Sequence, residues 1–357
     1  MVEDWKRSLH SRRIGMTNIT TWPSKTFFLV GAPRCGTTSL ALALAEHPQV
    51  CFSEPKEPHF FTRISEDADL VQLRTEYLGR FFRPDRLSRA ALGEASVSYL
   101  YSRQAIALID RMFPTARFLV MVRNPVEMIP SYHARLLFTL DEDVADFEAA
   151  WRLQERRAAG HAIPSRCRDP RMLQYAEVGR VGARLADLIS LVGRERVKTI
   201  VMDDFAAAPT AVYRDVIAFL GLEQQERPEV VRMNATKSYR SPAIQRLLMR
   251  PPKVAQRLLA PRTVGPSRTG GVVGRLLKRL RKANVVRAHW RPISASLRQE
   301  IAASVRDDVD LLGRLLQRDL AHWLDDGVRS SGGKPAVGTT EQARGEQVVR
   351  LKDARRS

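Results

Sequence analysis

The hydrophobic and polar positions of the chain repeat one pattern, in which a short apolar run leads into a polar turn and then into a helical period. The first unit begins with KTFFLVGA and continues as SLALALAEHP, whose helical pattern stops at Pro48. The second has an apolar run at 117–122, a polar turn at 123–125 and a helix that must accommodate Pro130. Short, unbroken apolar runs of this kind are typical of strands buried on both faces.

A third unit follows, with an apolar run near 197–202 and a helical pattern from about Thr210 to Leu220. Gly221, directly after this pattern, predicts a glycine C-cap. Strands that alternate with helices at this spacing predict an α/β fold with a central parallel sheet flanked by helices.

The remaining patterned segments add a strand and two helices. VCFSE predicts a short strand after the first helix, and DEDVADFEAAWRLQERRAAG predicts a helix over 141–160 with an acidic lead-in. The segment 296–323 predicts a long amphipathic helix, with apolar positions at Ile301, Val305, Val309, Leu312, Leu315 and Leu316. The last part, 327–357, has Gly, Ser and charged residues without periodicity, which predicts a disordered tail. We therefore expect an N-terminal extension over 1–24, one domain over 25–326, and this tail.

The composition changes this picture little. Hydrophobic residues make up 44% and charged residues 27% of the 357 residues, as in ordinary globular proteins. No stretch approaches the roughly 18 apolar residues of a membrane span, and the start of the chain lacks the apolar region of a signal peptide. The three scattered cysteines do not form a disulfide framework or the spaced pairs of a zinc site, and they suit a reducing compartment. We expect a cytoplasmic protein.

The charge is concentrated in one segment. Residues 230–299 contain 17 Lys or Arg residues and no Asp or Glu, and so supply most of the formal net charge of +19. Such a basic surface attracts polyanions, among them nucleotide bisphosphates, acidic glycans, nucleic acids and anionic lipid headgroups. Within it, GRLLKRLRKANVVRAHW at 274–290 is basic and amphipathic, a pattern found in helices that bind membrane surfaces and also in solvated helices that cover a sheet.

The turn of the first unit resembles a nucleotide phosphate loop but departs from it at one position. Gly31 and Gly36 have the spacing of G-x-x-x-x-G-K-[ST] and Thr38 follows, but Thr37 stands where the lysine belongs. The glycines and the helix start retain the backbone N–H groups that bind an anion. Arg34 within the loop offers a bidentate contact to a single anionic group, which suits a magnesium triphosphate poorly.

The segment VGAPRCGTTSL resembles the 5′-phosphosulfate loop of sulfotransferases that use 3′-phosphoadenosine 5′-phosphosulfate (PAPS). This resemblance implies an α/β, P-loop-like three-layer fold and a set of donor-binding residues: Pro33, Arg34, Cys35, Gly36, Thr37, Thr38 and Ser39. The second unit, FLVMVRNPVEMIPSYHARL, is similar to the family segment whose arginine and serine bind the 3′-phosphate. It implies that Arg123 and Ser131 do so here. Cys35 has two open interpretations, a passive loop residue or a reactive thiol at a helix start.

The segment PKEPHFF is similar to the KE-x-HFF segment of heparan sulfate and related carbohydrate sulfotransferases, in which the glutamate is the general base. The resemblance implies that Glu57 is the catalytic base and that Arg34 stabilises charge on the leaving phosphate. His59 is the alternative base, because cytosolic members of the superfamily use a histidine. Lys56 has two interpretations, a residue that orients the substrate or a surface charge.

The segment LGEASVSYLY resembles the GE-x-S/T-P-x-Y segment of the family, with two departures. Ala95 stands where heparan-type enzymes have a lysine, and Val97 replaces a common proline, which argues against a glycosaminoglycan-like acceptor. Glu94 and Ser96 either line the pocket or form buried hydrogen bonds. The resemblance extends over about Lys25 to Trp323, but it lacks a clear K-G-R donor loop in the second half. The nearest donor-binding candidates there are Lys237 and Arg240.

The leading hypothesis is a sulfotransferase that moves a sulfuryl group from PAPS to a hydroxyl on a carbohydrate, a glycolipid or a small metabolite, without a metal. One alternative is a P-loop kinase-like enzyme, which requires magnesium and a carboxylate near Thr38. The other is a basic protein that binds nucleic acid or a membrane surface through 230–299. With the sulfotransferase hypothesis we expect no nucleic-acid partner, but an anionic membrane surface or an acidic acceptor can contact the basic segment.

Overall fold

The computed structural model describes residues 23–65, 67–225, 237–249, 279–281, 283–287 and 293–325. The tail predicted over 327–357, nearly all of the N-terminal extension predicted over 1–24, and most of the basic segment 230–299 lie outside these residues. The elements below belong to one unit, which ends at Leu324. No helix among the residues described is long and apolar enough to cross a membrane.

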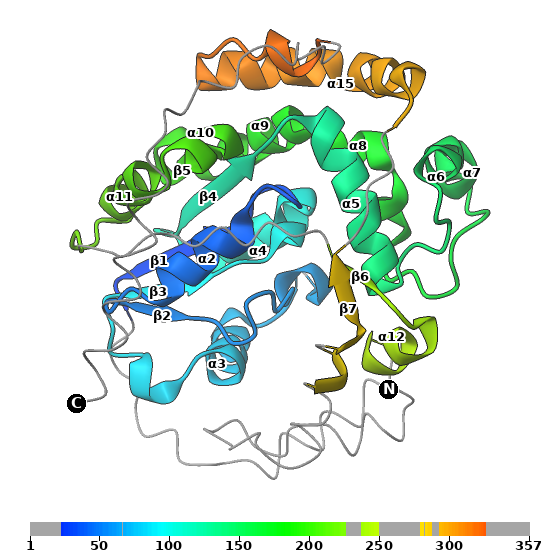
Figure 1. The fold of residues 1–357 in the computed structure, drawn as a ribbon. Helices are drawn as coiled ribbons and strands as arrows, with labels where there is room; N and C mark the ends of the chain where they lie inside the picture. Colours follow the sequence, from blue (N-terminus) through cyan, green and yellow to red (C-terminus); the bar gives the residue numbers. More distant parts are fainter. Residues whose placement is uncertain are drawn as a thin grey trace, which may run out of the picture. The chain divides into compact units, whose positions relative to one another are not determined.

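A parallel sheet forms the centre of this unit, as predicted, with the strand order β2-β3-β1-β4-β5. The strands are β1 Lys25–Leu29, β2 Val50–Phe52, β3 Ala91–Glu94, β4 Arg117–Val122 and β5 Val197–Val201. In Figure 1 they follow one another from β5 near the top to β2 near the bottom. The short antiparallel pair of β6 Lys237–Tyr239 and β7 Val285–Arg287 is separate from this sheet.

The chain changes direction across the sheet between β1 and β4. From β1 it continues toward the β3–β2 edge, whereas from β4 it continues to β5 at the other edge. In open parallel sheets, ligands bind in the crevice at the carboxyl ends of the strands where such a reversal occurs. Because β1 and β4 pair directly, the loops after these two strands flank the crevice.

Helices flank the sheet (Figure 1). They are α2 Thr37–Ala45, α3 Leu70–Phe81, α4 Arg103–Met112, α5 Pro125–Thr139, α6 Phe147–Arg152, α7 Gln154–Ala158, α8 Tyr175–Gly179, α9 Val181–Val192, α10 Met202–Ala207, α11 Pro209–Leu220, α12 Pro242–Met249 and α15 Ala295–Leu316. The 3₁₀ turns are η1 Phe61–Arg63, η2 Pro84–Arg86, η3 Val97–Tyr101, η4 Pro170–Leu173, η5 Arg194–Arg196 and η6 Ala321–Trp323.

The three predicted strand–helix units are confirmed, and two helix predictions are wrong in extent. Gly221 caps α11 in the left-handed region, and α5 contains Pro130 in its interior. The segment 141–160, predicted as one helix, forms the pair α6 and α7 instead. Helix α6 starts only after Asp146, whose side chain accepts from the Ala149 N–H. The helix predicted over 296–323 ends at Leu316, where Gln317 turns left-handed.

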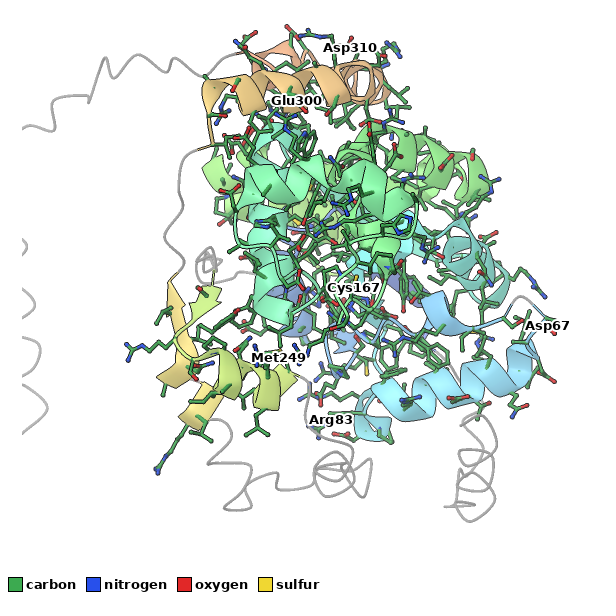
Figure 2. All side chains as sticks on the ribbon, turned by 90° about the vertical axis from the view of Figure 1, so that its right-hand side faces the viewer. Asp67, Arg83, Cys167, Met249, Glu300 and Asp310 are labelled. Atoms are coloured by element: carbon green, nitrogen blue, oxygen red, sulfur yellow. The ribbon has the colours of Figure 1, made fainter. Side chains whose placement is uncertain are left out.

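Helix α15 is fixed to the rest of the unit by its buried face and by two carboxylates. It packs on α9 at the top of Figure 1 through buried Ile301, Val305 and Val309. Asp308 accepts the N–H groups of Gly182 and Ala183, in the first turn of α9, at 2.7 Å each. Glu300, labelled in Figure 2, accepts from the Trp151 indole of α6 at 2.7 Å. The two Asp308 contacts supply partners to N–H groups that an isolated helix start leaves unpaired.

Candidate active site

The loop between β1 and α2 has the backbone of an anion-binding turn. Gly36 lies in the left-handed region at φ 85° and precedes Thr37, the first residue of α2. Arg34 is also left-handed, at φ 65°, a conformation that costs a non-glycine residue roughly 1–2 kcal/mol and that gathers at functional sites. The first turn of this described helix has no acidic side chain. The N–H groups of this turn form the positive end of the helix dipole, and no carboxylate in the turn offsets their attraction for an anion.

The position of this loop depends on the missing side chain of Gly31. A Cβ at residue 31 would lie only 2.0 Å from the backbone nitrogen of Met121 in β4. The Val30 and Ala32 N–H groups donate to the Leu119 and Met121 carbonyls at 2.9 and 3.0 Å. The loop therefore starts in direct contact with the strand that leads to Arg123.

Two residues of the predicted donor loop are buried outside the cavity lining. Cys35 is fully buried, and its burial raises the pKa of the thiol to about 12. Its Sγ lies 3.5 Å from the Pro33 carbonyl oxygen, within the loop itself. Ser39 is also buried. Neither belongs to the described residues that line the cavity, and their role in donor binding stays a prediction.

Arg34 and Ser131 connect the two loops of the crevice. The Arg34 Nε donates to the Ser131 Oγ at 2.9 Å. Arg135 lies one turn beyond Ser131 on α5, and Arg123 lies at the end of β4. Burial, followed by the positive charges of Arg135 and Arg123, lowers the pKa of Arg34. Because a guanidinium stays charged despite such a shift, this cluster of cations favours an anionic ligand.

The turn that carries Arg123 is fixed by the next residue, Asn124, through both polar atoms of its side-chain amide. The Asn124 side-chain Oδ1 accepts from the Val126 N–H at 2.9 Å and so caps α5. The Asn124 amide donates to the Trp323 carbonyl oxygen at 3.0 Å. Arg123 itself pairs with Glu127, one turn into α5, at 2.8 Å. An anion that binds Arg123 therefore competes with the Glu127 carboxylate.

Glu57 and His59 lie on the loop after β2, and both line the same cavity as Arg34. The Lys56 Nζ donates to Glu57 Oε1 at 2.6 Å, and His59 Nε2 lies 3.6 Å from Glu57 Oε2. Burial alone raises the pKa of Glu57, but the hydrogen bond with His59 and the charge of Lys56 outweigh it and lower the pKa to about 2. Glu57 is therefore ionised at neutral pH. His59 adopts φ 50°, and its Nδ1 lies 2.7 Å from Ser98 Oγ.

The cavity has a volume of about 1700 Å³, larger than the roughly 300–1,000 Å³ of a typical small-molecule site. It contains Pro33, Arg34, Gly36, Thr37 and Thr38 of the first loop, together with Glu57, His59, Arg123 and Ser131. Nine arginines and five carboxylates occur among its described lining residues, so its wall is net positive. Residues predicted from three separate sequence segments thus share one cavity, and their chemical roles stay predictions.

Seven lining arginines were missed by the sequence analysis: Arg63, Arg135, Arg168, Arg171, Arg184, Arg281 and Arg298. Arg135 could have been recognised from the sequence, because it follows Ser131 by four residues and so lies on the same face of the helix. Arg168 and Arg171 lie between helices in a segment without periodicity, where Arg168 pairs with Asp141 and Arg171 with Asp169. Cys167, labelled in Figure 2, lines the cavity beside them.

Of the two second-half candidates, Arg240 is not among the described residues that line this cavity. Arg240 is exposed, and its N–H donates to the Asn284 carbonyl oxygen at 2.9 Å. Lys237 is described only in its backbone, as the first residue of β6. Instead, the basic segment contributes Arg281, Val285 and Arg298 to the cavity wall.

No family model matches the chain. It is 25% identical over 252 residues to carbohydrate sulfotransferase 15 of Mus musculus, which covers 56% of this chain and 45% of the relative. It is 34% identical over 109 residues to heparan sulfate glucosamine 3-O-sulfotransferase 6 of Homo sapiens, 30% of each chain. The chain thus spans less than half the length of these relatives.

Among solved structures, the fold is similar to that of a sulfotransferase from Alicyclobacillus acidocaldarius. The two share 26% sequence identity with a TM-score of 0.54, over 84% of this chain and 98% of the other. The resemblance read from the sequence motifs is confirmed by a sequence relative over 56% of this chain and by a solved structure over 84% of it. In sequence and in fold, the chain is therefore similar to sulfotransferases.

Proposed function

We propose that this protein transfers a sulfuryl group from PAPS to a hydroxyl group of a carbohydrate acceptor. One observation carries the proposal: Arg34, Arg123 and Ser131 line a single cavity together with Glu57. Two positive groups beside a helix N-terminus suit a ligand with two anionic ends, and a carboxylate in the same cavity suits proton removal. The carbohydrate sulfotransferase relatives support the reaction type and the class of acceptor.

The first loop would hold the phosphosulfate end of the donor. Arg34 and the N–H groups at the start of α2 would face the 5′-phosphate, and Arg123 with Ser131 the 3′-phosphate. The donor supplies an activated sulfuryl group whose leaving group is the 5′-phosphate. Arg34 then has a clear role, because its charge stabilises the negative charge that grows on the bridging oxygen as the sulfur–oxygen bond breaks. In this proposal the arginines and the helix dipole replace a metal ion.

Glu57 would accept the proton of the attacking hydroxyl while the new oxygen–sulfur bond forms. A carboxylate with a pKa near 2 is ionised but is a weak base. It can therefore take the proton only late, after bonding to sulfur has made the hydroxyl acidic. His59, 3.6 Å from Glu57, would orient the carboxylate and is the alternative base.

The size and charge of the cavity support an acceptor bound beside the nucleotide. The volume of about 1700 Å³ exceeds the needs of one small ligand. Arg63 and Arg298 belong to the wall and form no ion pair that the structure shows among its described residues. These cations favour a carbohydrate that carries carboxylate or sulfate groups over a neutral one. Their charge outweighs the sequence argument against a glycosaminoglycan-like acceptor, since Ala95, one of the two departures behind that argument, is buried and is not among the described residues of the wall.

The described residues contain no group of three or more His, Cys, Asp or Glu side chains suited to hold a metal ion. The choice of nucleotide distinguishes the metal-free sulfotransferase from the alternative, because a kinase-like enzyme would bind a magnesium triphosphate. A thermal-shift comparison of adenosine 3′,5′-bisphosphate, ADP, and ATP with magnesium separates the two. At a concentration of 100 Kd, the bisphosphate would stabilise the protein by about 2.7 kcal/mol.

The proposed reaction itself is tested with ³⁵S-labelled PAPS and two matched acceptors, heparan sulfate and a neutral oligosaccharide. Transfer of label to the anionic glycan, without added metal and in the presence of a chelator, is the expected result. Stabilisation by ATP with magnesium alone, together with no transfer of label, contradicts the proposal and favours the kinase-like alternative.

A further inference from the structure

A buried carboxyl group lies directly behind the loop that carries Glu57 and His59. Glu94, the last residue of β3, is only 1% exposed and is not among the described residues of the cavity wall. Its Oε2 accepts hydrogen bonds from the hydroxyls of Tyr77 and Tyr99, the latter at 3.2 Å. Burial raises the pKa of Glu94 to about 7 despite these hydrogen bonds.

Tyr99 connects Glu94 to the loop that carries Glu57 and His59. Its hydroxyl oxygen accepts from the backbone N–H groups of Phe60 and Phe61, at 3.0 and 3.5 Å. Because its own proton is donated to Glu94, its lone pairs are available for both N–H groups. The Tyr77 hydroxyl meets the same Glu94 oxygen from α3, but the structure shows it in no hydrogen bond to the loop backbone.

The residues after Glu94 hold the same loop at further points. The Ser96 Oγ accepts from the His59 N–H at 3.0 Å, and the Ala95 N–H donates to the Lys56 carbonyl oxygen at 3.3 Å. The loop residues 56–60 form neither helix nor strand. Their backbone therefore lacks the regular ladder that usually fixes a chain, and these side-chain and backbone hydrogen bonds replace it.

We propose that Glu94 is a positioning residue: through the Tyr99 hydroxyl it fixes the Lys56–Phe61 loop, and with it the direction in which Glu57 and His59 face the cavity. The inference rests on the proposed function for its catalytic consequence. Neither Glu94 nor Tyr99 touches the cavity, so both act through the loop and not on a ligand.

The test compares Tyr99→Phe with Tyr77→Phe, since each variant keeps its aromatic ring and removes one hydroxyl from the same Glu94 oxygen. Hydrogen–deuterium exchange at the Phe60 and Phe61 amides reports on the loop directly. Loss of a buried hydrogen bond is expected to raise exchange at these amides about tenfold or more in Tyr99→Phe. Tyr77→Phe, although it loses a similar buried bond, should leave their exchange within about twofold.

The catalytic arm uses ³⁵S-labelled PAPS with heparan sulfate as acceptor. For Tyr99→Phe we expect kcat to fall about tenfold or more with the KM for PAPS nearly unchanged, since the donor-binding loops are untouched. Tyr77→Phe should retain kcat. Equal amide exchange in the two variants, or equal losses of kcat, would overturn the inference. If the unmodified protein transfers no label, the proposed function fails, and the amide exchange alone still decides whether Glu94 and Tyr99 fix the loop.

Discussion

The guanidinium of Arg34 donates through Nε to the hydroxyl of Ser131 at 2.9 Å, although the residues are 97 positions apart in the chain. This hydrogen bond joins the loop after β1 to the helix after β4, the two segments that flank the reversal in strand order. The hydrogen bond holds the side chains of the candidate crevice in one arrangement, and such a fixed arrangement lowers the entropy lost on binding.

Ser131→Ala removes the acceptor of this hydrogen bond, and Arg34→Lys keeps the charge but loses the planar fork of donors. We expect each to weaken the binding of adenosine 3′,5′-bisphosphate by about 10- to 100-fold, the effect of losing a charge-assisted hydrogen bond. Isothermal titration calorimetry measures this change. Ser190→Ala, at an exposed serine of α9, is the matched control and should bind normally. Unchanged affinity in Ser131→Ala would contradict the assignment of the 3′-phosphate site.

Glu57→Gln keeps the shape of the proposed base but cannot accept a proton. We expect kcat to fall about 100-fold or more, in line with the loss of general base catalysis. Stabilisation by adenosine 3′,5′-bisphosphate should persist, because Glu57 lies on a different loop from Arg34 and Ser131. His59→Gln is the comparison: if it abolishes turnover while Glu57→Gln retains it, the histidine is the base.

Gly31→Ala should destabilise the protein, because the new Cβ would lie 2.0 Å from the Met121 nitrogen and the rigid backbone on both sides must shift. Overpacking of this kind costs about 1–3 kcal/mol. The matched control is Gly79→Ala in α3, where a Cβ would meet nothing within 4 Å. There the higher helix propensity of alanine should stabilise the protein by about 0.5–1 kcal/mol. Urea denaturation measures both changes, and equal midpoints would contradict the close contact at Gly31.

Glu94→Gln should alter how stability depends on pH between 4.5 and about 7. Because the folded-state pKa of Glu94 is raised, the folded protein retains a proton that the unfolded chain releases near pH 4.5. The stabilisation linked to this proton is fully present below pH 4.5 and is lost as the pH rises through about 7. It amounts to about 3 kcal/mol, at roughly 1.4 kcal/mol per pKa unit.

In Glu94→Gln this part of the pH dependence should disappear, which denaturant midpoints at pH 4.5, 6 and 8 can show. Glu57→Gln provides the contrast. The pKa of Glu57 is lowered to about 2, so its stabilisation is present above pH 4.5 and is lost only as the pH falls through about 2. A difference between Glu94→Gln and the unmodified protein that is constant from pH 4.5 to 8 would show that Glu94 does not titrate in this range.

The strands and the two candidate anion-binding loops were predictable because their signals are local. An apolar run predicts the buried strand β4, and Gly221 predicts the left-handed cap that ends α11. The two glycines and Arg34 predict an anion-binding turn, since only its backbone N–H groups and one guanidinium are required. The strand order is not local, and so the contact between Arg34 and Ser131 could be expected only through the family resemblance.

The rest of the site depends on how segments without regular structure cover the crevice. Arg168 lies in a loop, and its position is set by Asp141, 27 residues away, which no periodicity predicts. The direction of Cys35 depends on the left-handed residues on both sides of it, Arg34 and Gly36. Glu94 was open to two interpretations from sequence, and the hydroxyls of Tyr77 and Tyr99 favour the buried hydrogen-bonding one.

The carboxylate of Asp308 accepts two of the first-turn N–H groups of α9 from a helix more than a hundred residues downstream. A truncated protein that stops before this residue would expose two amide donors at the start of α9 and strip the apolar cover from the same surface. The shortest fragment worth expressing must therefore extend through α15. C-terminal truncations that aim at the smallest active fragment should therefore end no earlier than Leu324.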